Sequence, residues 1–583
     1  MLTGGSFILA SCNDFLDREP LDSVTPDNFF FTENDLAAYA VKHYNFTTHE
    51  GFNAGIWKND NATDNQAATD YDKKWIPGQW KVPEAYDNPA SNDPWYFSTI
   101  REANYFLETV VPRFEKGEIE GSETNIKHYI GEMYFLRAKN YLSKLETFGD
   151  FPIIKNTLPD ESESLIQASK RAPRYKVAHF ILEDLDQAIS LLTNNISGGK
   201  NRITKNAALL LKSRAALFEA SWLTYHKGTA LVPGGPGWPG KAEDIADFNI
   251  DTEIAFFLKE AKAAAKEVIG NAALVQNTAK DCMDETVKTD EDKYKMSNPY
   301  FAQFSANSLE GYSEILMWRA YNLLDYKIVH SAPFYIRVGG NTGFTRQYVE
   351  SFLCRDGKPI YATDQYKGDE SLLNVRKNRD LRLQLFLMTP GETLSPNVMN
   401  GTPDLLPEVP QLLDITEKRC VTGYQVRKGL SGNWYRDGNT AIEGCPVYRV
   451  AEAYLNYIEA DCMEHNGTSI GSEAAGYWGD LRERAGLPRD YTVTVNNTDL
   501  SKELDWAVYS AGKTVSPLLY NIRRERRCEL LAEGLRMLDL KRWRALDQVK
   551  QFVIEGVNLW ESDLKDKYMQ DGKNLLIQEG TEG

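Results

Sequence analysis

The fold class is decided by one stretch of the chain, Phe180-Ile181-Leu182-Glu183-Asp184-Leu185-Asp186-Gln187-Ala188-Ile189-Ser190-Leu191-Leu192. Its apolar residues recur at steps of three and four, which places them on one face of an α-helix. A second apolar stripe of the same kind follows Thr204 and runs from Ala207 to Phe218. Neither helix can bury its apolar face alone, so the two must pack against each other and against further helices. The stretch therefore predicts a mostly helical protein built from helix pairs.

The same pattern recurs along the rest of the chain. Further helices are predicted for residues 95–111, 130–145, 254–269, 447–463, 477–485 and 518–546. Asp93-Pro94 opens the first of them with an N-cap residue and a proline at the first helical position, and 447–463 is the expected partner of 254–269. Helix pairs of about 34 residues with small and aromatic packing residues are typical of tetratricopeptide repeats. We expect about four pairs; a non-repeating helical bundle is the alternative, because the spacing between pairs is irregular.

One region interrupts the series of helices. Residues 280–440 contain short aromatic runs between Gly, Pro, Asn and Asp residues, with no long helical period. Within it, Ile315-Leu316-Met317-Trp318 predicts a short buried strand. A segment of this length inside a compact domain is usually functional or a subdomain. The predicted fold is therefore a mostly α, tetratricopeptide-like scaffold with a loop-rich ligand-binding subdomain inserted. The predicted regions are 13–279, with helical repeats and an aromatic loop at 57–97, then the insert 280–440, and then C-terminal helical repeats at 441–583.

The N-terminal segment ends a short apolar stretch with Leu9-Ala10-Ser11-Cys12, which is typical of a bacterial lipoprotein signal peptide. Residues 1–12 would be this signal peptide, and Cys12 would be acylated and would begin the mature protein. The apolar part is short and no Lys or Arg precedes it, so either the start of the signal is truncated or Cys12 is an ordinary buried cysteine. No run of about 18 apolar residues follows Cys12. We expect a soluble body held to a membrane by lipid.

Composition and motifs argue against several classes of function. The net charge of −17 disfavours nucleic acid, whose binding depends on clustered Lys and Arg. The seven histidines show no H-E-x-x-H spacing, no G-x-S-x-G motif is present, and the cysteines form no C-x-x-C pair. We therefore predict no catalytic residues, no metal site and no cofactor. A glycoside hydrolase is the enzymatic alternative, since it needs only two suitably placed carboxylates.

The aromatic loop 57–97 is the main candidate for a binding site. It contains Trp57, Tyr71, Trp75, Trp80 and Tyr86 among Asp60, Asn61, Asp64, Asn65, Gln66 and Asp72. Trp and Tyr offer broad, rigid faces that stack on sugar rings, while amide and carboxylate groups hydrogen-bond the hydroxyls. The predicted ligand-binding residues of the loop are Trp75, Trp80, Tyr86, Asp60, Asp64 and Tyr71. Each aromatic residue has an alternative role as a cap on the helical core. A Ca²⁺ ion at the Asp60–Asp72 run is a weaker alternative, because the run lacks the spacing and glycine of an EF-hand loop.

Short motifs along the whole chain carry a resemblance to a known family. They are Cys12-Asn13-Asp14-Phe15-Leu16-Asp17, residues 131–138 with Phe148-Gly149-Asp150-Phe151-Pro152, residues 202–208, residues 378–383, and the closing run 525–530, 533–536 and 539–543. The closing run is the most specific; each motif alone is weak, but their order is informative. The chain resembles the SusD/RagB family, the surface lipoproteins of Bacteroidetes that bind nutrients beside a TonB-dependent transporter of the outer membrane.

This resemblance implies a function and a location. The protein would be lipid-anchored to the outer face of the outer membrane, would capture a glycan, and would hand it to a SusC-like TonB-dependent transporter. The resemblance implies ligand-contacting aromatic residues in the loop 57–97 and in the mid-chain insert, where Tyr294, Tyr300 and Tyr312 are the candidates. Peptide is the alternative ligand, since some relatives bind peptide.

The charged residues of the closing run form a regular series. They are Glu525, Arg526, Arg527, Glu529, Glu533 and Arg536. Glutamates spaced by four residues share one helix face, and arginines at neighbouring steps of the same helix are placed to pair with them. We interpret the series as a charge-laced scaffold helix rather than an acid/base pair. Gly534 inside this helix would cost about 1 kcal/mol relative to Ala, which predicts that another backbone approaches closely there.

Overall fold

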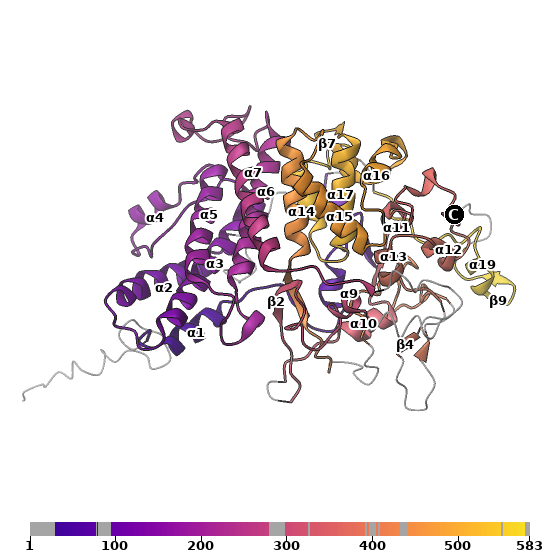
Figure 1. Cartoon of the computed structure of the whole chain (residues 1–583), viewed down its shortest axis with the longest axis horizontal. Coiled ribbons are helices and arrows are strands. Elements are labelled where there is room, and N and C mark those ends of the chain that lie inside the picture. The colour runs from indigo at the N-terminus through magenta and orange to yellow at the C-terminus, as the bar shows by residue number, and fades with distance from the viewer. Residues whose placement is uncertain are drawn as a thin grey trace, which may run out of the picture.

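The fold is mostly helical, as the sequence predicts. The computed structural model describes residues 29–76, 78–79, 95–278, 298–324, 327–390, 393–395, 404–405, 409–431, 440–549 and 552–577. In Figure 1 the N-terminal helices stand on the left, the C-terminal helices stand beside them in the centre, and short helices and loops occupy the right and lower parts. The predictions for Cys12, Trp80, Tyr86 and Tyr294 fall outside the described residues.

The scaffold is a row of helices in which each packs on the next. The N-terminal helices are α1 (Glu33–Lys42), α2 (Ser98–Glu115), α3 (Glu123–Phe148), α4 (Ser162–Ala168), α5 (Arg174–Leu191), α6 (Lys205–His226) and α7 (Ile250–Asn271). α2 packs on α3, α3 on α5, α5 on α6 and α6 on α7. Thr204 begins α6 by accepting a hydrogen bond from the backbone N–H of Ala207, a typical N-cap contact. A local signal in the sequence thus sets where α6 begins.

The C-terminal helices extend the same row. α14 (Ala451–Glu464) packs on α7, and both α15 (Ser472–Arg484) and α17 (Pro517–Glu529) pack on α14. Lys262 of α7 forms ion pairs with Asp461 (2.7 Å) and Glu464 (2.6 Å) of α14. The predicted late partner of residues 254–269 is therefore confirmed, although about 180 residues separate the two helices in sequence.

Two stretches predicted as single helices contain other elements in the structure. Residues 445–449 form strand β6 (Cys445–Arg449) before α14 begins. Residues 518–546 form two helices, α17 and α18 (Arg536–Arg542), with Ala532 and Gly534 at positive φ between them. The prediction that Gly534 lies inside a helix is wrong. A close neighbour is present, because a Cβ atom on Gly534 would lie 2.7 Å from the Cβ of Asn59, but this neighbour is a side chain and not a backbone.

Short elements make up the chain between α7 and α14 and lie in the lower and right parts of Figure 1. They are α9 (Pro299–Ala302), β2 (Ile315–Arg319), α10 (Ala332–Val338), β3 (Thr342–Phe344), α11 (Arg346–Ser351), α12 (Leu372–Arg376), α13 (Leu381–Phe386), β4 (Thr393–Ser395) and β5 (Asp404–Leu405). β2 pairs antiparallel with β6, and β1 (Gln66–Ala68) pairs antiparallel with β3. Trp318 on β2 is buried, as predicted. The remaining elements are α16 (Thr492–Asn496), α19 (Leu564–Lys567), β7 (Tyr509–Ser510), β8 (Lys513–Thr514), β9 (Met569–Gln570) and β10 (Lys573–Asn574).

A second hydrophobic core lies beside the helical one. It joins Trp57 from the aromatic loop, Tyr300 and Phe386 from the mid-chain region, and Leu531 after α17. Three distant parts of the chain thus share this core. In this core the mid-chain region packs against the aromatic loop and against the segment that follows α17.

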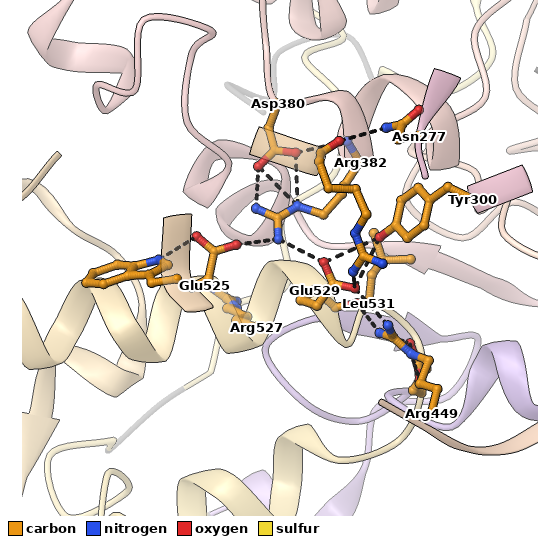
Figure 2. Close-up of polar contacts among 12 residues, drawn as sticks. Asn277, Tyr300, Asp380, Arg382, Arg449, Glu525, Arg527, Glu529 and Leu531 are labelled. Atoms are coloured by element: carbon orange, nitrogen blue, oxygen red, sulfur yellow. Dashed lines mark hydrogen bonds and ion pairs between the residues drawn. The ribbon is translucent and has the colours of Figure 1, made fainter. Parts of the chain in front are cut away.

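A buried network of ion pairs connects α17 to the mid-chain region (Figure 2). Arg382 donates to Asp380, Glu525 and Glu529, while Arg449 donates to Glu529 (2.7 Å). Burial alone would raise the pKa of Glu529, but Arg484, Arg449 and Arg382 outweigh it and hold this pKa far below its ordinary value. The scaffold role of the charged series is confirmed. The ion-pair partners of these charged residues, however, lie on other elements and not on neighbouring turns of the same helix.

Candidate functional site

The two acidic residues predicted as ligand contacts, Asp60 and Asp64, are fully buried. Asp64 accepts hydrogen bonds from Arg536 (2.7 and 2.8 Å) and from Arg527 (3.2 Å). Asp60 accepts hydrogen bonds from the side-chain amide of Asn65 (3.2 Å) and from the backbone N–H of Arg536 (3.4 Å), and burial raises the pKa of its carboxyl to about 6. Both carboxylates thus anchor the aromatic loop to the segment around α18, and neither has surface to offer a ligand. Of the acids considered for Ca²⁺, Asp60 and Asp64 are engaged in this way, and Asp72 pairs with Lys74 (3.0 Å).

Trp75 and Tyr71 differ in how much surface they expose. Trp75 ends a short 3-10 helix, is only 9% exposed, and packs edge-on against Trp506 (4.9 Å) and Phe552 (5.5 Å). Tyr71 is 42% exposed, and its hydroxyl donates to the carbonyl of Phe552 (2.8 Å). Ile76 beside them is also exposed. In this part of the loop, Tyr71 presents an aromatic ring to solvent, whereas Trp75 serves as the centre of a small aromatic cluster.

The mid-chain candidates do not join the loop residues in one site. Tyr300 is buried, and its hydroxyl donates to Glu529 (3.2 Å) within the ion-pair network of Figure 2. Burial raises the pKa of this hydroxyl far above its ordinary value. Tyr312 is half-buried and packs on the small cluster around Trp318. Tyr300 therefore has a structural partner already, and Tyr312 lies in a separate part of the protein.

The last residues of the aromatic loop line a pocket at the N-terminal end of α2. Its volume is about 490 Å³, within the range of ligand pockets. Trp95 stacks on Phe148 (3.9 Å between ring centroids), and Phe97 stacks on Phe151 (5.0 Å). The lining residues are Trp95, Phe97, Ile100, Arg101, Asn104, Pro152, Ile154, Asn156, Leu158, Leu165, Ser169 and Arg171. We refer to this site as the aromatic pocket.

The local sequence explains why the aromatic pocket is preformed. Gly149 has a φ of 73° and turns the chain after α3, so that Phe151 pairs with Ala172 in an antiparallel bridge. Asn104 on α2 then holds the segment beyond the bridge, because its amide donates to the carbonyls of Ile154 (2.9 Å) and Asn156 (3.2 Å). The back wall is thus fixed by backbone contacts and needs no ligand to form.

Asn104 is itself held in place by a buried ion pair. Arg137 donates to the side-chain oxygen of Asn104 (2.9 Å) and forms a bidentate pair with Asp184 (2.7 and 2.8 Å). All three side chains are buried. Three helices, α2, α3 and α5, therefore fix the orientation of a single amide at the back of the pocket.

The rim of the aromatic pocket is polar. Arg101, Asn156, Ser169 and Arg171 are exposed there, and the guanidinium of Arg171 lies over the Trp95 ring (4.8 Å). Among the described lining residues none is Asp, Glu, His or Cys. An apolar wall with hydrogen-bonding groups at its edge suits a ligand with one apolar and one polar face. The described part of the lining thus holds none of the carboxyl, imidazole or thiol groups that commonly act as general acids or bases.

The sequence missed Trp95 and Phe97 as site residues, although both lie within the predicted loop. Asp93-Pro94 placed them in the first turn of a helix, where aromatic residues normally pack as core. In the structure α2 begins at Ser98, so both rings precede the helix and turn toward the pocket. The stacked rings of Phe148 and Phe151 come from a different motif, which sequence spacing cannot connect to Trp95.

Metal-ligand clusters and membrane-spanning helices are absent from the described part of the chain. The described residues contain no group of three or more His, Cys, Asp or Glu side chains arranged to hold a metal ion. Of the described helices, none is both long and apolar enough to span a bilayer. The described cysteines, Cys354, Cys420, Cys445, Cys462 and Cys528, are buried and form no disulfide.

Two family models of related description match most of the chain. A family model described as "SusD family" matches residues 288–578, and a second, described as "Starch-binding associating with outer membrane", matches residues 14–217. SusD-like protein P2 of Formosa agariphila is 25% identical over 557 residues, covering 93% of this chain and 89% of that protein.

Solved structures share the fold. A SusD-like carbohydrate binding protein of Bacteroides fragilis has a TM-score of 0.61 at 18% identity, covering 92% of this chain and 91% of that one. A second SusD-like protein of the same organism has a TM-score of 0.59 at 21% identity, covering 91% and 89%. A further similar structure, with a TM-score of 0.50 at 17% identity and coverage of 88% and 82%, contains a xylogluco-oligosaccharide.

Proposed function

The chain belongs to the SusD/RagB family, and from that premise we propose that it is a cell-surface lipoprotein that captures a glycan and delivers it to a SusC-like, TonB-dependent transporter of the outer membrane. Cys12 is the proposed lipid attachment site. The family model for residues 14–217 is described as associating with the outer membrane, which supports this location.

The observation that carries the glycan proposal is the aromatic pocket. A pyranose ring has an apolar face of C–H groups and a rim of hydroxyls. The pocket offers the matching surfaces, because Trp95 and Phe97 form an apolar wall and Arg101 and Asn156 stand at its edge. The wall is held by Asn104 before any ligand arrives, so little conformational entropy is lost on binding.

The exposed ring of Tyr71 is a second proposed contact, at a separate place on the loop. Trp80 and Tyr86, which lie between Tyr71 and the aromatic pocket in sequence, keep their predicted role as ligand contacts. Asp60, Asp64 and Tyr300 are left out of the proposed site because their polar atoms are already engaged by other residues of the chain.

We propose binding without catalysis. Hydrolysis of a glycosidic bond needs two carboxyl groups on either side of the bond, and none of the described residues that line the aromatic pocket carries one. The similar structure that contains a xylogluco-oligosaccharide supports an oligosaccharide as ligand. The apolar share of the pocket lining also suits an apolar side chain of a peptide, so peptide is retained as the second candidate.

The proposal is tested by calorimetric titration of residues 13–583 with panels of oligosaccharides and peptides. Phe97→Ala should weaken oligosaccharide binding at least tenfold, since stacking on an aromatic ring contributes about 1 to 3 kcal/mol by analogy with nucleobases. Phe52→Ala is the matched control, because Phe52 is an exposed phenylalanine outside the pocket. If only peptides bind, the ligand is a peptide and not a glycan. If Phe97→Ala binds oligosaccharide with unchanged affinity, the glycan binds outside the aromatic pocket. If the protein releases shorter sugars from an oligosaccharide, it is an enzyme.

A further inference from the structure

A second cavity, of about 310 Å³, lies between the N-terminal and C-terminal halves of the scaffold. Its walls come from α3, α6, the junction of β6 and α14, and the segments 46–59 and 533–538. Its polar lining residues are Thr47, Asn59, Lys139, Ser143, Glu146, Arg214, Tyr448, Arg449, Glu452 and Glu533. It shares no lining residue with the aromatic pocket. We refer to it as the polar cavity.

Most charged groups of the polar cavity are already paired with one another. Arg214 forms a bidentate pair with Glu452 (2.6 and 2.7 Å). Arg449 forms another with Glu533 (2.8 and 2.7 Å). These pairs fix the walls in one geometry and leave the walls close to neutral.

Lys139 is held outside these pairs. Its ammonium group donates to the backbone carbonyl (2.9 Å) and side-chain oxygen (3.0 Å) of Asn45. The amine therefore has a fixed position near the cavity and has one N–H bond left. It adds a positive charge to the cavity that the pairs above do not cancel.

Glu146 is the exception among the acidic groups. Its carboxyl forms no hydrogen bond or ion pair with any residue that the structure describes, although Arg214, Lys139 and Lys541 lie close enough to lower its pKa. Burial outweighs these cations and raises the pKa of Glu146 to about 7. The residue also lies in the last turn of α3, where the helix dipole disfavours a negative charge. The side chain is only half-buried, so a molecule in the cavity can reach the carboxyl and hydrogen-bond to it.

The other polar groups near Glu146 that have no hydrogen-bond partner among the described residues are uncharged hydroxyl and amide groups. Ser143 lies one turn before it on the same face of α3, at the exposed edge of the cavity, and its hydroxyl forms no hydrogen bond with the described residues. The same holds for the hydroxyl of Tyr448 and the side-chain amide of Asn59 in that part of the chain. Glu146 would repel an anionic ligand, and Lys139 and Arg214 would repel a cationic one. A neutral molecule with several hydroxyl groups satisfies all of these groups together.

We propose that the polar cavity is a second ligand site, which binds a small hydroxyl-rich molecule of the size of one sugar residue, with Glu146 hydrogen-bonding two neighbouring hydroxyls. A carboxyl group suits this task because its two oxygens match the spacing of vicinal hydroxyls, and in its protonated form it also donates. The volume is at the lower end of the range for ligand pockets, which fits a single ring and excludes a chain of several. The site is independent of the glycan proposal for the aromatic pocket.

The test uses residues 13–583 and a panel of free monosaccharides, namely glucose, galactose, mannose and xylose, at concentrations up to ~10 mM. Saturation-transfer NMR detects binding, and titration gives the affinity. We expect at least one sugar to bind, and Glu146→Leu to weaken it at least tenfold. Glu146→Gln keeps the shape and can still donate and accept, so it should weaken binding less.

Two control variants distinguish binding in the polar cavity from binding elsewhere on the protein. Glu123→Leu, at the exposed first turn of α3, should leave monosaccharide affinity unchanged. Phe97→Ala should also leave it unchanged, because Phe97 belongs to the aromatic pocket. The proposal is overturned if no sugar of the panel binds, if Glu146→Leu binds as tightly as the unmutated protein in a folded state shown by thermal unfolding, or if Phe97→Ala alone abolishes binding.

Discussion

The two ends of the aromatic loop differ in what surrounds them. At the first end, Asp64 lies in the interior between the guanidinium groups of Arg527 and Arg536. At the other end, Phe97 stacks on Phe151 and lines a pocket with a polar rim. The same mixture of aromatic and acidic residues thus serves stability at one end and a ligand-sized surface at the other. Residue type alone does not separate the two roles; the partners that the fold supplies do.

The largest expected effect lies at the buried end. Asp64→Ala removes a carboxylate that pairs with two buried arginines and leaves their charge only partly compensated by Asp505. Breaking such a pair costs about 3 to 5 kcal/mol of unfolding free energy. Urea denaturation measures this loss. Glu123→Ala is the matched control, because its partner Lys127 is exposed on the helix surface, and little change is expected there. Equal midpoints for the two variants would show that the loop is not anchored through Asp64.

The second effect separates two aromatic residues of the same loop. Trp75→Ala leaves a cavity between Trp506 and Phe552 and should lower the unfolding free energy by about 3 kcal/mol, as large-to-small core changes do. Tyr71→Ala removes an exposed ring and one hydrogen bond, so a loss of about 1 kcal/mol is expected. Thermal unfolding of both variants checks the order. A Trp75→Ala protein as stable as the unmutated one, with weaker glycan binding, would instead support the sequence-based assignment of Trp75 as a ligand contact.

The helical scaffold was accessible from sequence because its signals are local. The apolar stripe of residues 180–192 and the N-cap at Thr204 need no knowledge of distant residues, and α5 and α6 form where these signals place them. The break between α17 and α18 was not accessible in this way. Residues 530–535 continue an apolar period, and only the packed structure reveals that Asn59 occupies the space beside Gly534.

The candidate site was less accessible, since its roles depend on long-range partners. Asp64 and Arg527 are separated by 463 residues, and Tyr300 and Glu529 by 229. Before folding, such residues look like the hydrogen-bonding groups of a binding loop. The stacking of Trp95 on Phe148 could not be predicted either, because the two rings belong to different sequence motifs. Sequence thus located the loop as a region of interest but could not assign its residues to core or surface.

The smallest effect concerns Asp60, the second acid at the buried end, and it depends on pH. Burial raises the pKa of Asp60 from 3.8 to about 6, against hydrogen bonds from Asn65 and Arg536 that lower it. Between these pH values the folded protein holds a proton that the unfolded chain has lost, so stability falls as the pH rises and stays reduced above 6.

Asp60→Asn removes this titration and keeps a hydrogen-bond acceptor. The variant should therefore be more stable than the unmutated protein at pH 8, by at most about 3 kcal/mol, and no more stable near pH 4. Urea denaturation at both pH values measures the difference, and comparison within each pH cancels the titration of all other groups. Asp70→Asn, an exposed aspartate of the same loop, is the control and should give no such gain. A loss of stability in Asp60→Asn at pH 8 would mean that Asp60, like Asp64, is held as a charged partner of the arginines, and the contrast between the two acids would disappear.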